Sequence, residues 1–320
     1  MRPVGSVTAA VLVALAAGQG LPRARADAAT AEFSGEQAFR RVGELLEFER
    51  HYEAAGRKRA VDFIAAAMKP YAPAVQRQRL EATERKSGKR YSLVNIIARQ
   101  NPSERKRILI GSHWDSRLWA EQDPDPAQRN RPIAGANDGA SGVAVLLELA
   151  RHTRALKGFG IDYVFFDGEE MGRPEDIQGY CQGSEYFAKH LGALYPADKP
   201  RAALVIDMVG DRSLDLYQEF SSLQSAPTMV SQIWRVASTL GLSSWHAKPK
   251  HNIIDDHTPF QRLGIPSILI IDYDYPHWHT QADTLDKVSA DSLGAVGRVL
   301  LQFLIERQRI GWDIDTLRRP

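Results

Sequence analysis

From residue 93 onward the chain alternates between short apolar runs and longer stretches with helical spacing, and this alternation constrains its fold more than any other feature. The runs typical of buried strands occupy 93–98, 108–111, 161–166, 203–206 and 267–271. The helical patterns occupy 142–155, 184–191, 228–240, 259–263 and 293–307. Because strands that are joined through helices pair in parallel, this order predicts a three-layer αβα sandwich with a central mixed, mainly parallel sheet.

Two further helical patterns precede the alternation. The first spans 36–48, and the second spans 57–68 and ends before Pro70. The chain that follows position 26 is about 290 residues long, which is enough to build one large hydrophobic core. We therefore expect a single catalytic domain over 27–320.

The first 26 residues have the pattern of a secretory signal peptide. Arg2 supplies a positive start, residues 7–17 are nearly all small and apolar, and 24–26 (Ala-Arg-Ala) resembles a cleavage site. The apolar run is too short to span a bilayer. We therefore expect an exported protein, periplasmic or secreted, with no transmembrane segment in the mature chain.

Removal of that segment changes the charge balance. It takes Arg2, Arg23 and Arg25 from the 41 Lys and Arg and nothing from the 39 Asp and Glu, which leaves 38 against 39 and a net charge of −1. Nucleic-acid binding then has no electrostatic basis in the composition. Cys181 is the single cysteine, so an internal disulfide is excluded.

Residues that can bind a metal or move a proton follow the apolar runs. They are His113, Asp138, Glu169, Glu170, Asp207 and His279. The carboxyl ends of parallel strands meet at one rim of the sheet, where ligands bind. Two histidines and several carboxylates at this rim suit zinc, with one carboxylate left over to move protons.

Each of these residues also has an ordinary structural explanation when taken alone. Asp138 fits the start of the helix that follows it, His113 and Asp115 fit a hydrogen-bonded pair, and His279 fits a capping or packing role. Their convergence at successive strand ends favours a metal site over these explanations.

Five segments resemble the zinc aminopeptidases of the M28 type, in the same order along the chain. They are 113–116 (His-Trp-Asp-Ser), 135–142 (Gly-Ala-Asn-Asp-Gly-Ala-Ser-Gly), 165–170 (Phe-Phe-Asp-Gly-Glu-Glu), 206–210 (Ile-Asp-Met-Val-Gly) and 278–280 (Trp-His-Thr). Within that group the chain is more similar to the glutaminyl cyclases. The specific features are 254–260 (Ile-Asp-Asp-His-Thr-Pro-Phe), Trp278 directly before His279, and the insert 123–126. The resemblance covers about 36–306.

The resemblance implies a zinc-dependent glutaminyl-peptide cyclotransferase, which converts the N-terminal Gln of peptides or proteins to pyroglutamate and releases ammonia. It implies a single zinc ion with three protein ligands, Asp138, Glu170 and His279, and a fourth position for substrate. It also implies that Glu169 is the acid/base, which carries a proton from the α-amine to the leaving ammonia.

The resemblance further implies that Asp207 and Asp255 form a hydrogen-bonded acidic pair that supports proton transfer, and that Trp278 walls the substrate pocket. In the aminopeptidases, however, His113 and Asp207 complete a second zinc site, which Asp138 bridges. An exported aminopeptidase with two zinc ions, which releases N-terminal amino acids, is therefore the alternative. A metal-bearing binding module without turnover is a third hypothesis.

Overall fold

The computed structural model describes residues 32–313 and residue 317. At its centre lies a six-stranded sheet with the strand order β1-β2-β4-β3-β5-β8. Its strands are β1 (Ala74–Thr83), β2 (Arg90–Gln100), β3 (Arg107–His113), β4 (Gly160–Phe166), β5 (Ala203–Asp207) and β8 (Ser267–Ile271). Strand β2 pairs antiparallel with β1 and β4, whereas β4, β3, β5 and β8 pair in parallel. The sheet is mixed and mainly parallel, as predicted.

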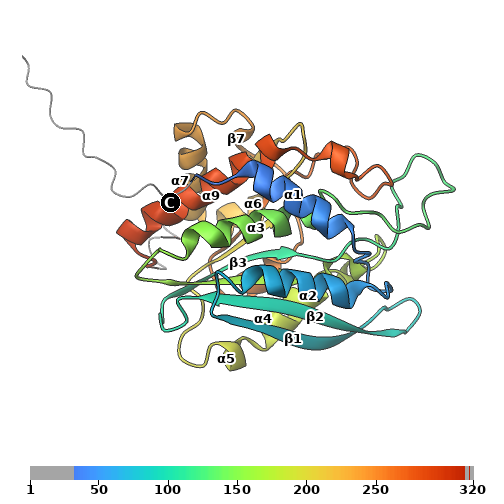
Figure 1. Cartoon of the computed structure of the whole chain (residues 1–320), viewed down its shortest axis with the longest axis horizontal. Coiled ribbons are helices and arrows are strands. Elements are labelled where there is room, and N and C mark those ends of the chain that lie inside the picture. Colours follow the sequence, from blue (N-terminus) through green and yellow to red (C-terminus); the bar gives the residue numbers. More distant parts are fainter. Residues whose placement is uncertain (1–31, 314–316, 318–320) are drawn as a thin grey trace, which may run out of the picture. The chain divides into compact units, whose positions relative to one another are not determined.

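Helices cover both faces of this sheet, which confirms the expected three layers (Figure 1). One face carries α1 (Gly35–Leu46), α2 (Arg57–Met68), α3 (Ala140–Thr153), α6 (Phe220–Ser225), α7 (Pro227–Thr239) and α9 (Ala290–Ile310). The other face carries α4 (Gln182–Lys189), α5 (Leu191–Leu194) and α8 (Thr258–Arg262).

Strand β3 illustrates why the central strands are continuous apolar runs. Ile108 and Ile110 belong to the larger hydrophobic cluster on one face, whereas Leu109 packs with Phe187 and Phe260 on the other. All seven residues of β3 are buried. Because water reaches neither face, no alternation with polar residues is required.

The strands and helices expected from the sequence are present, with ends shifted by a few residues. The sequence did not predict β1, the small parallel sheet of β6 (Leu216–Gln218) and β7 (Trp245–Pro249), or α6. Strand β1 lies at an edge of the sheet and is mostly exposed or half-buried, so 76–79 (Gln-Arg-Gln-Arg) shows no apolar run. An edge strand is held by its hydrogen bonds to β2 rather than by burial of every side chain.

Three short 3₁₀ helices complete the described elements: η1 (Glu169–Met171), η2 (Ile177–Gly179) and η3 (Leu285–Lys287). Within the described residues, no helix is long and apolar enough to cross a membrane. The predicted signal peptide over 1–26 lies outside the part of the chain that the structure describes.

Candidate metal centre and active site

The predicted site residues meet at the carboxyl ends of the parallel strands. His113 is the last residue of β3, Asp207 is the last residue of β5, and the Glu169–Glu170 pair begins η1, directly after β4. Asp138 lies in the loop before α3. This is the rim where an α/β sheet binds ligands.

Gly139 allows Asp138 to approach His113. Its φ is +91°, and a Cβ there would lie 2.6 Å from the carbonyl oxygen of Asp115 and 3.0 Å from the His113 ring. Any other residue would strain the backbone and push the two loops apart. Glycine at position 139 therefore lets the loop of Asp138 pack close to His113, and so helps to form the site.

Asp138, Glu170 and His279 form a group that we call the open cluster. All three are buried, yet all three line a cavity of about 320 Å³. The Nε2 atom of His279 lies 3.6 Å from Oδ2 of Asp138 and 3.5 Å from Oε1 of Glu170. Oδ2 of Asp138 accepts no hydrogen bond from the described residues.

The geometry of the open cluster fits a metal ion. Ligand atoms bonded to zinc at about 2.0 to 2.2 Å in a tetrahedron are separated by roughly 3.3 to 3.6 Å. The two distances from His279 Nε2 fall in this range. A buried carboxylate oxygen without a donor is costly, and a cation supplies the missing partner. The three residues therefore fit a single zinc ion with one further position free.

The electrostatics of the open cluster point to the same fit. Burial, together with the charge of Glu170, raises the pKa of Asp138 well above its usual value. Burial alone would raise the pKa of Glu170 too, but the charges of His279 and Arg117 outweigh it and hold that pKa below its usual range. Burial lowers the pKa of His279, but Glu170 and Glu121 outweigh this effect and raise it to about 9. Such crowding of acids is relieved by a bound cation.

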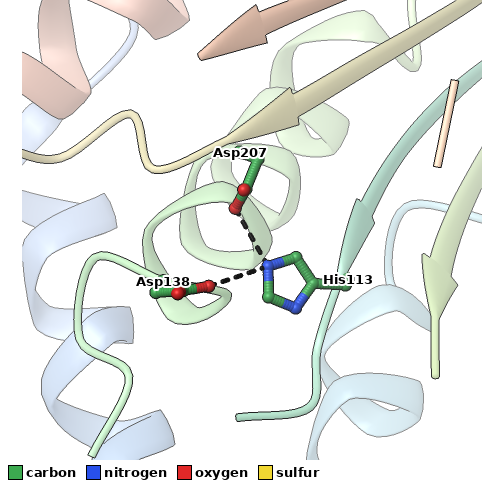
Figure 2. A group of neighbouring side chains, drawn as sticks. All are labelled: His113, Asp138 and Asp207. Atoms are coloured by element: carbon green, nitrogen blue, oxygen red, sulfur yellow. Dashed lines mark hydrogen bonds and ion pairs between the residues drawn. The ribbon is translucent and has the colours of Figure 1, made fainter. Parts of the chain in front are cut away.

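A second group, His113, Asp138 and Asp207, is held together by direct contacts, and we call it the closed cluster. Figure 2 shows the His113 ring facing both carboxylates, with Nε2 at 2.9 Å from Oδ1 of Asp207 and 3.2 Å from Oδ1 of Asp138. His113 does not line the cavity. Burial lowers the pKa of His113, but the charge of Asp207 and bonds to Asp115 and Asp138 outweigh it and raise the pKa well above its usual value.

Two residues that the sequence reasoning missed support the open cluster. Arg117 is fully buried and donates to Oε2 of Glu170 at 2.9 Å and to both carboxylate oxygens of Glu121. Oε1 of Glu121 in turn lies 2.9 Å from Nδ1 of His279, which leaves Nε2 to face the cluster. A carboxylate behind a histidine fixes the ring and its tautomer, as at many zinc sites.

The sequence contains only a weak local pattern that could have indicated the pairing of Arg117 with Glu121. Arg117 and Glu121 are four residues apart, a spacing that indicates an ion pair within a helix. Neither residue lies in a helix, so the signal did not apply. A third missed residue, Asp283, accepts from the backbone N–H groups of Asn137 and Asp138 and so fixes the loop that carries Asp138.

Glu169 lies beside a different set of groups from its neighbour Glu170. Ligand atoms of Glu169, Cys181 and Asp255 lie within 4.8 Å of one another, and the Cys181 thiol donates to Oε1 of Glu169 at 3.5 Å. Burial and the charge of Glu170 raise the pKa of Glu169 well above its usual value. A raised pKa suits a side chain that takes up and releases a proton.

Asp255 and Asp207 both line the cavity and interact through their charges. Burial and the charge of Asp207 raise the pKa of Asp255 to about 6. Within the described residues no direct hydrogen bond joins the two carboxylates; Oδ1 of Asp255 accepts from the N–H of Asp256, and Oδ1 of Asp207 accepts from that of Met208. The acidic pair is thus close, but not directly bonded.

Trp278 forms one wall of the cavity. Its ring stacks on the His279 ring, with centroids 3.9 Å apart and planes inclined by 28°. The Tyr273 ring also packs against Trp278, and the exposed side chains of Ile177 and Ile254 line the cavity too. The cavity therefore joins a polar floor of carboxylates and histidine to an apolar mouth.

Comparison with known proteins agrees with this geometry. The family model for peptidase family M28 matches residues 95–304, which is more than half of the chain. The protein belongs to peptidase family M28. The match begins in β2 and ends in α9, so it includes every residue of both clusters.

Solved structures of M28-type enzymes superpose on nearly the whole described fold. The glutaminyl cyclase of Porphyromonas gingivalis is 34% identical, with a TM-score of 0.81 over 87% of this chain and 100% of that chain. A Zn-dependent exopeptidase from Parabacteroides distasonis is 32% identical, with a TM-score of 0.82 over 86% of this chain and 99% of that chain. The expected zinc aminopeptidase-like fold is confirmed.

Curated relatives also carry the glutaminyl-peptide cyclotransferase name. The enzyme of Bothrops jararaca is 24% identical over 248 residues, which are 68% of this chain and 66% of that protein. The enzyme of Bos taurus is 24% identical over 245 residues, or 67% and 66%. The chain thus spans just under two thirds of the length of these animal relatives. The resemblance to glutaminyl cyclases within the M28 group is confirmed.

Proposed function

We propose that this M28 family member is a zinc-dependent glutaminyl-peptide cyclotransferase, which acts on the N-terminal Gln of peptides or proteins. The observation that carries the proposal is the open cluster, a three-donor site on the floor of a cavity that also contains Glu169. The similarity to bacterial glutaminyl cyclases over almost their whole length supports the same activity.

In this proposal the protein holds one zinc ion through Asp138, Glu170 and His279. When bound, zinc supplies Lewis-acid polarisation of the substrate γ-carbonyl. The distances within the open cluster and the unpartnered Oδ2 of Asp138 support one ion in this place. Arg117 and Glu121 orient Glu170 and His279 from behind.

Glu169 moves the proton. The α-amine nitrogen of the substrate bonds to the γ-carbon, and the bond from that carbon to the amide nitrogen breaks. Glu169 takes one proton from the amine and delivers it to the departing nitrogen, which leaves as ammonia. Asp255 and Asp207 are the positioning residues for this transfer, because the charge of Asp255 helps to raise the pKa of Glu169 and the charge of Asp207 in turn raises the pKa of Asp255.

Trp278 and the apolar mouth limit water. Cyclisation joins two groups of one bound molecule, so correct placement lowers much of the entropic part of the barrier. The protein must then exclude a water that would attack the same carbonyl. The stacking of Trp278 on His279 supports this role for the indole.

A two-zinc aminopeptidase is the second candidate, and one observation favours it. His113, Asp138 and Asp207 bring donor atoms within 4.8 Å of one another, so these three residues would hold a second ion, with Asp138 common to both clusters. That protein would use Glu169 to activate a water for attack on the first peptide bond. The similarity to the Zn-dependent exopeptidase is compatible with this alternative.

A paired substrate assay separates the two candidates. Two peptides that differ only in an N-terminal Gln or Leu are incubated with the protein and with its Glu169→Gln variant. We expect ammonia and a pyroglutamyl product from the Gln peptide, no free amino acid from the Leu peptide, and little product with the variant. Efficient release of free Leu without pyroglutamate would assign the site to an aminopeptidase.

We also propose that the protein is exported after cleavage behind Ala26. The sequence pattern of 1–26 supports this, and the described residues contain no helix that could cross a membrane. Intact mass of the protein recovered from the periplasm or the medium tests it. A cytoplasmic protein that retains Met1 to Ala26 would contradict export.

A further inference from the structure

A second cavity, with a volume of about 310 Å³, lies where the N-terminal end of α2 meets β1 and β2. Figure 1 shows α2 lying along these two strands. The two cavities share no lining residue. The second cavity is lined by Tyr52, Ala54, Arg57, Lys58, Val61, Arg77, Arg79, Ser92, Val94, Trp114 and Asp167.

The lining of this cavity is strongly basic. Arg57 and Lys58 come from α2. Arg77 and Arg79 are two positions apart on β1, so their side chains lie on the same face of that strand. Asp167 is the single acid in the lining. A second acid, Asp62, does not line the cavity but pairs with two lining residues, Lys58 at 2.7 Å and Arg77 at 2.6 Å. Four positive and two negative side chains leave a net charge of +2.

Two of these cations have unused hydrogen-bonding capacity. Arg79 makes no ion pair with any described residue. Arg57 is almost buried, pairs with Asp167 and lies over the Trp114 ring at 4.9 Å, yet its Nε finds no acceptor in the described part of the chain. The buried Nε–H of Arg57 is costly to leave without an acceptor, and Arg79 is exposed at the cavity, where its guanidinium is free to pair with an anion.

The start of α2 adds a second, independent reason. Its first three residues, Arg57, Lys58 and Arg59, are all basic, no acid lies in the first turn, and no side chain caps the helix. The N-terminal end of a helix carries partial positive charge and unpaired N–H groups, so three cations there repel it. A helix that begins this way beside a cavity is suited to an anion.

We propose that this cavity binds a small oxyanion of the phosphate class, with Arg57 and Arg79 as its principal donors. The net charge of +2 matches a phosphate dianion. The aromatic floor of Tyr52 and Trp114 and the paired Lys58 and Arg77 form the rest of the site.

Titration calorimetry with inorganic phosphate at fixed ionic strength tests the proposal. We expect saturable binding by the full protein and about tenfold weaker binding by Arg79→Gln, the loss of one charge-assisted bond. Arg90→Gln is the matched control, because Arg90 is an exposed arginine of the same hairpin that does not line the cavity. Equal affinity of the two variants, or no binding by the unmodified protein, would overturn the site.

Two further titrations distinguish phosphate bound in this cavity from phosphate bound at the metal centre, and phosphate from a dicarboxylate. The variant His279→Ala should keep the phosphate affinity of the unmodified protein, because phosphate held at the metal centre would be lost with that residue. Succinate in place of phosphate should bind more weakly. Tighter binding of succinate would assign the cavity to dicarboxylates and contradict the phosphate class, and loss of binding in His279→Ala would assign it to the metal centre.

Discussion

The open and closed clusters share Asp138 and use the same kinds of residue, but they differ in what their atoms already contact. In the closed cluster, Nε2 of His113 lies at 2.9 and 3.2 Å from two carboxylate oxygens, which are hydrogen-bond distances. In the open cluster, Nε2 of His279 lies at 3.5 and 3.6 Å from its two neighbours and faces the cavity. The two clusters therefore differ by a few tenths of an ångström in these contact distances, and in whether the histidine lines the cavity.

Ligand-type residues alone therefore do not define a metal site. Nε2 of His113 already directs its single proton at the Oδ1 atoms of two buried acids, so these two oxygens have a partner without an ion. His279, whose other nitrogen is fixed by Glu121, presents its free nitrogen to Glu170 and to Oδ2 of Asp138, which lacks a donor. The open cluster is therefore the better candidate for the ion, although both clusters have donor atoms within 4.8 Å.

The largest expected effect comes from removing one histidine from each cluster. His279→Ala should abolish tight zinc binding and reduce cyclisation to background, because the open cluster loses one of three ligands. His113→Gln, which keeps a polar side chain, should retain about one zinc ion per chain. Metal analysis of dialysed protein measures both.

The outcome decides between the two candidate enzymes. If the unmodified protein holds two zinc ions and His113→Gln loses one of them, the closed cluster is a metal site as well. The two clusters would then both bind zinc, and the aminopeptidase would be favoured. Circular dichroism of each variant checks that the fold is retained.

A smaller effect is expected from Glu169→Gln, which sharpens the distinction between ligand and proton carrier. Turnover should fall by roughly two to four orders of magnitude, the usual contribution of general acid–base catalysis. Zinc content should not change, because Glu169 lies beside Cys181 and Asp255 rather than within the open cluster. Loss of zinc from this variant would show that Glu169 is a ligand.

Glu121→Gln tests the support behind the open cluster. It should weaken zinc affinity by about 10- to 100-fold, the usual cost of losing a carboxylate behind a metal-binding histidine. Glu175→Gln, in an exposed segment, is the control for removal of one negative charge. Competition with a chelator measures the affinities. Equal zinc affinity in the two variants would leave Glu121 without a role at the metal.

The smallest effect on the clusters is expected from Glu219→Gln. Glu219 accepts a hydrogen bond from the backbone N–H of Ile253, which lines the cavity. Burial would raise the pKa of Glu219, but bonds to His257 and Ser222 outweigh it and lower the pKa to about 2 from an ordinary value of 4.5. The depressed pKa stabilises the fold above pH 4.5, and this stability is lost as the pH falls towards 2. The full contribution of this pKa shift to the free energy of unfolding is about 3 kcal/mol.

Urea unfolding at several pH values between neutral and 2 measures this contribution. The unmodified protein should lose its stability advantage over Glu219→Gln as the pH falls from 4.5 to 2. Zinc content at neutral pH should be the same in both. A constant difference in unfolding free energy across that pH range would show that Glu219 does not titrate as expected.

Much of the fold and the first layer of the site could be predicted from local sequence. Strands β3, β4, β5 and β8 are buried on both faces, so each is mainly apolar with a visible end, although β4 contains the buried Asp162. His113, Asp207 and the Glu169–Glu170 pair stand at or just after such ends. Parallel pairing brings these ends to one rim, and the rule needs no knowledge of side-chain contacts.

Other parts depended on contacts between distant segments. Strand β1 has no apolar run, because it pairs at an edge, and Arg117 reaches Glu170 across 53 positions. Glu121 and His279 are 158 positions apart, yet their bond decides which nitrogen faces the cavity. No local pattern records such pairs.

Local sequence patterns are enough to predict the order of the buried strands and their helices, the rim, and the types of residue gathered there, because burial and periodicity act over a few neighbouring positions. The tertiary structure decided which of two histidines faces the cavity and which is already bonded to acids. It also brought four cations of α2 and β1 around a second cavity. These features depend on distances of tenths of an ångström between segments far apart in the chain, and such distances are fixed only when the core packs.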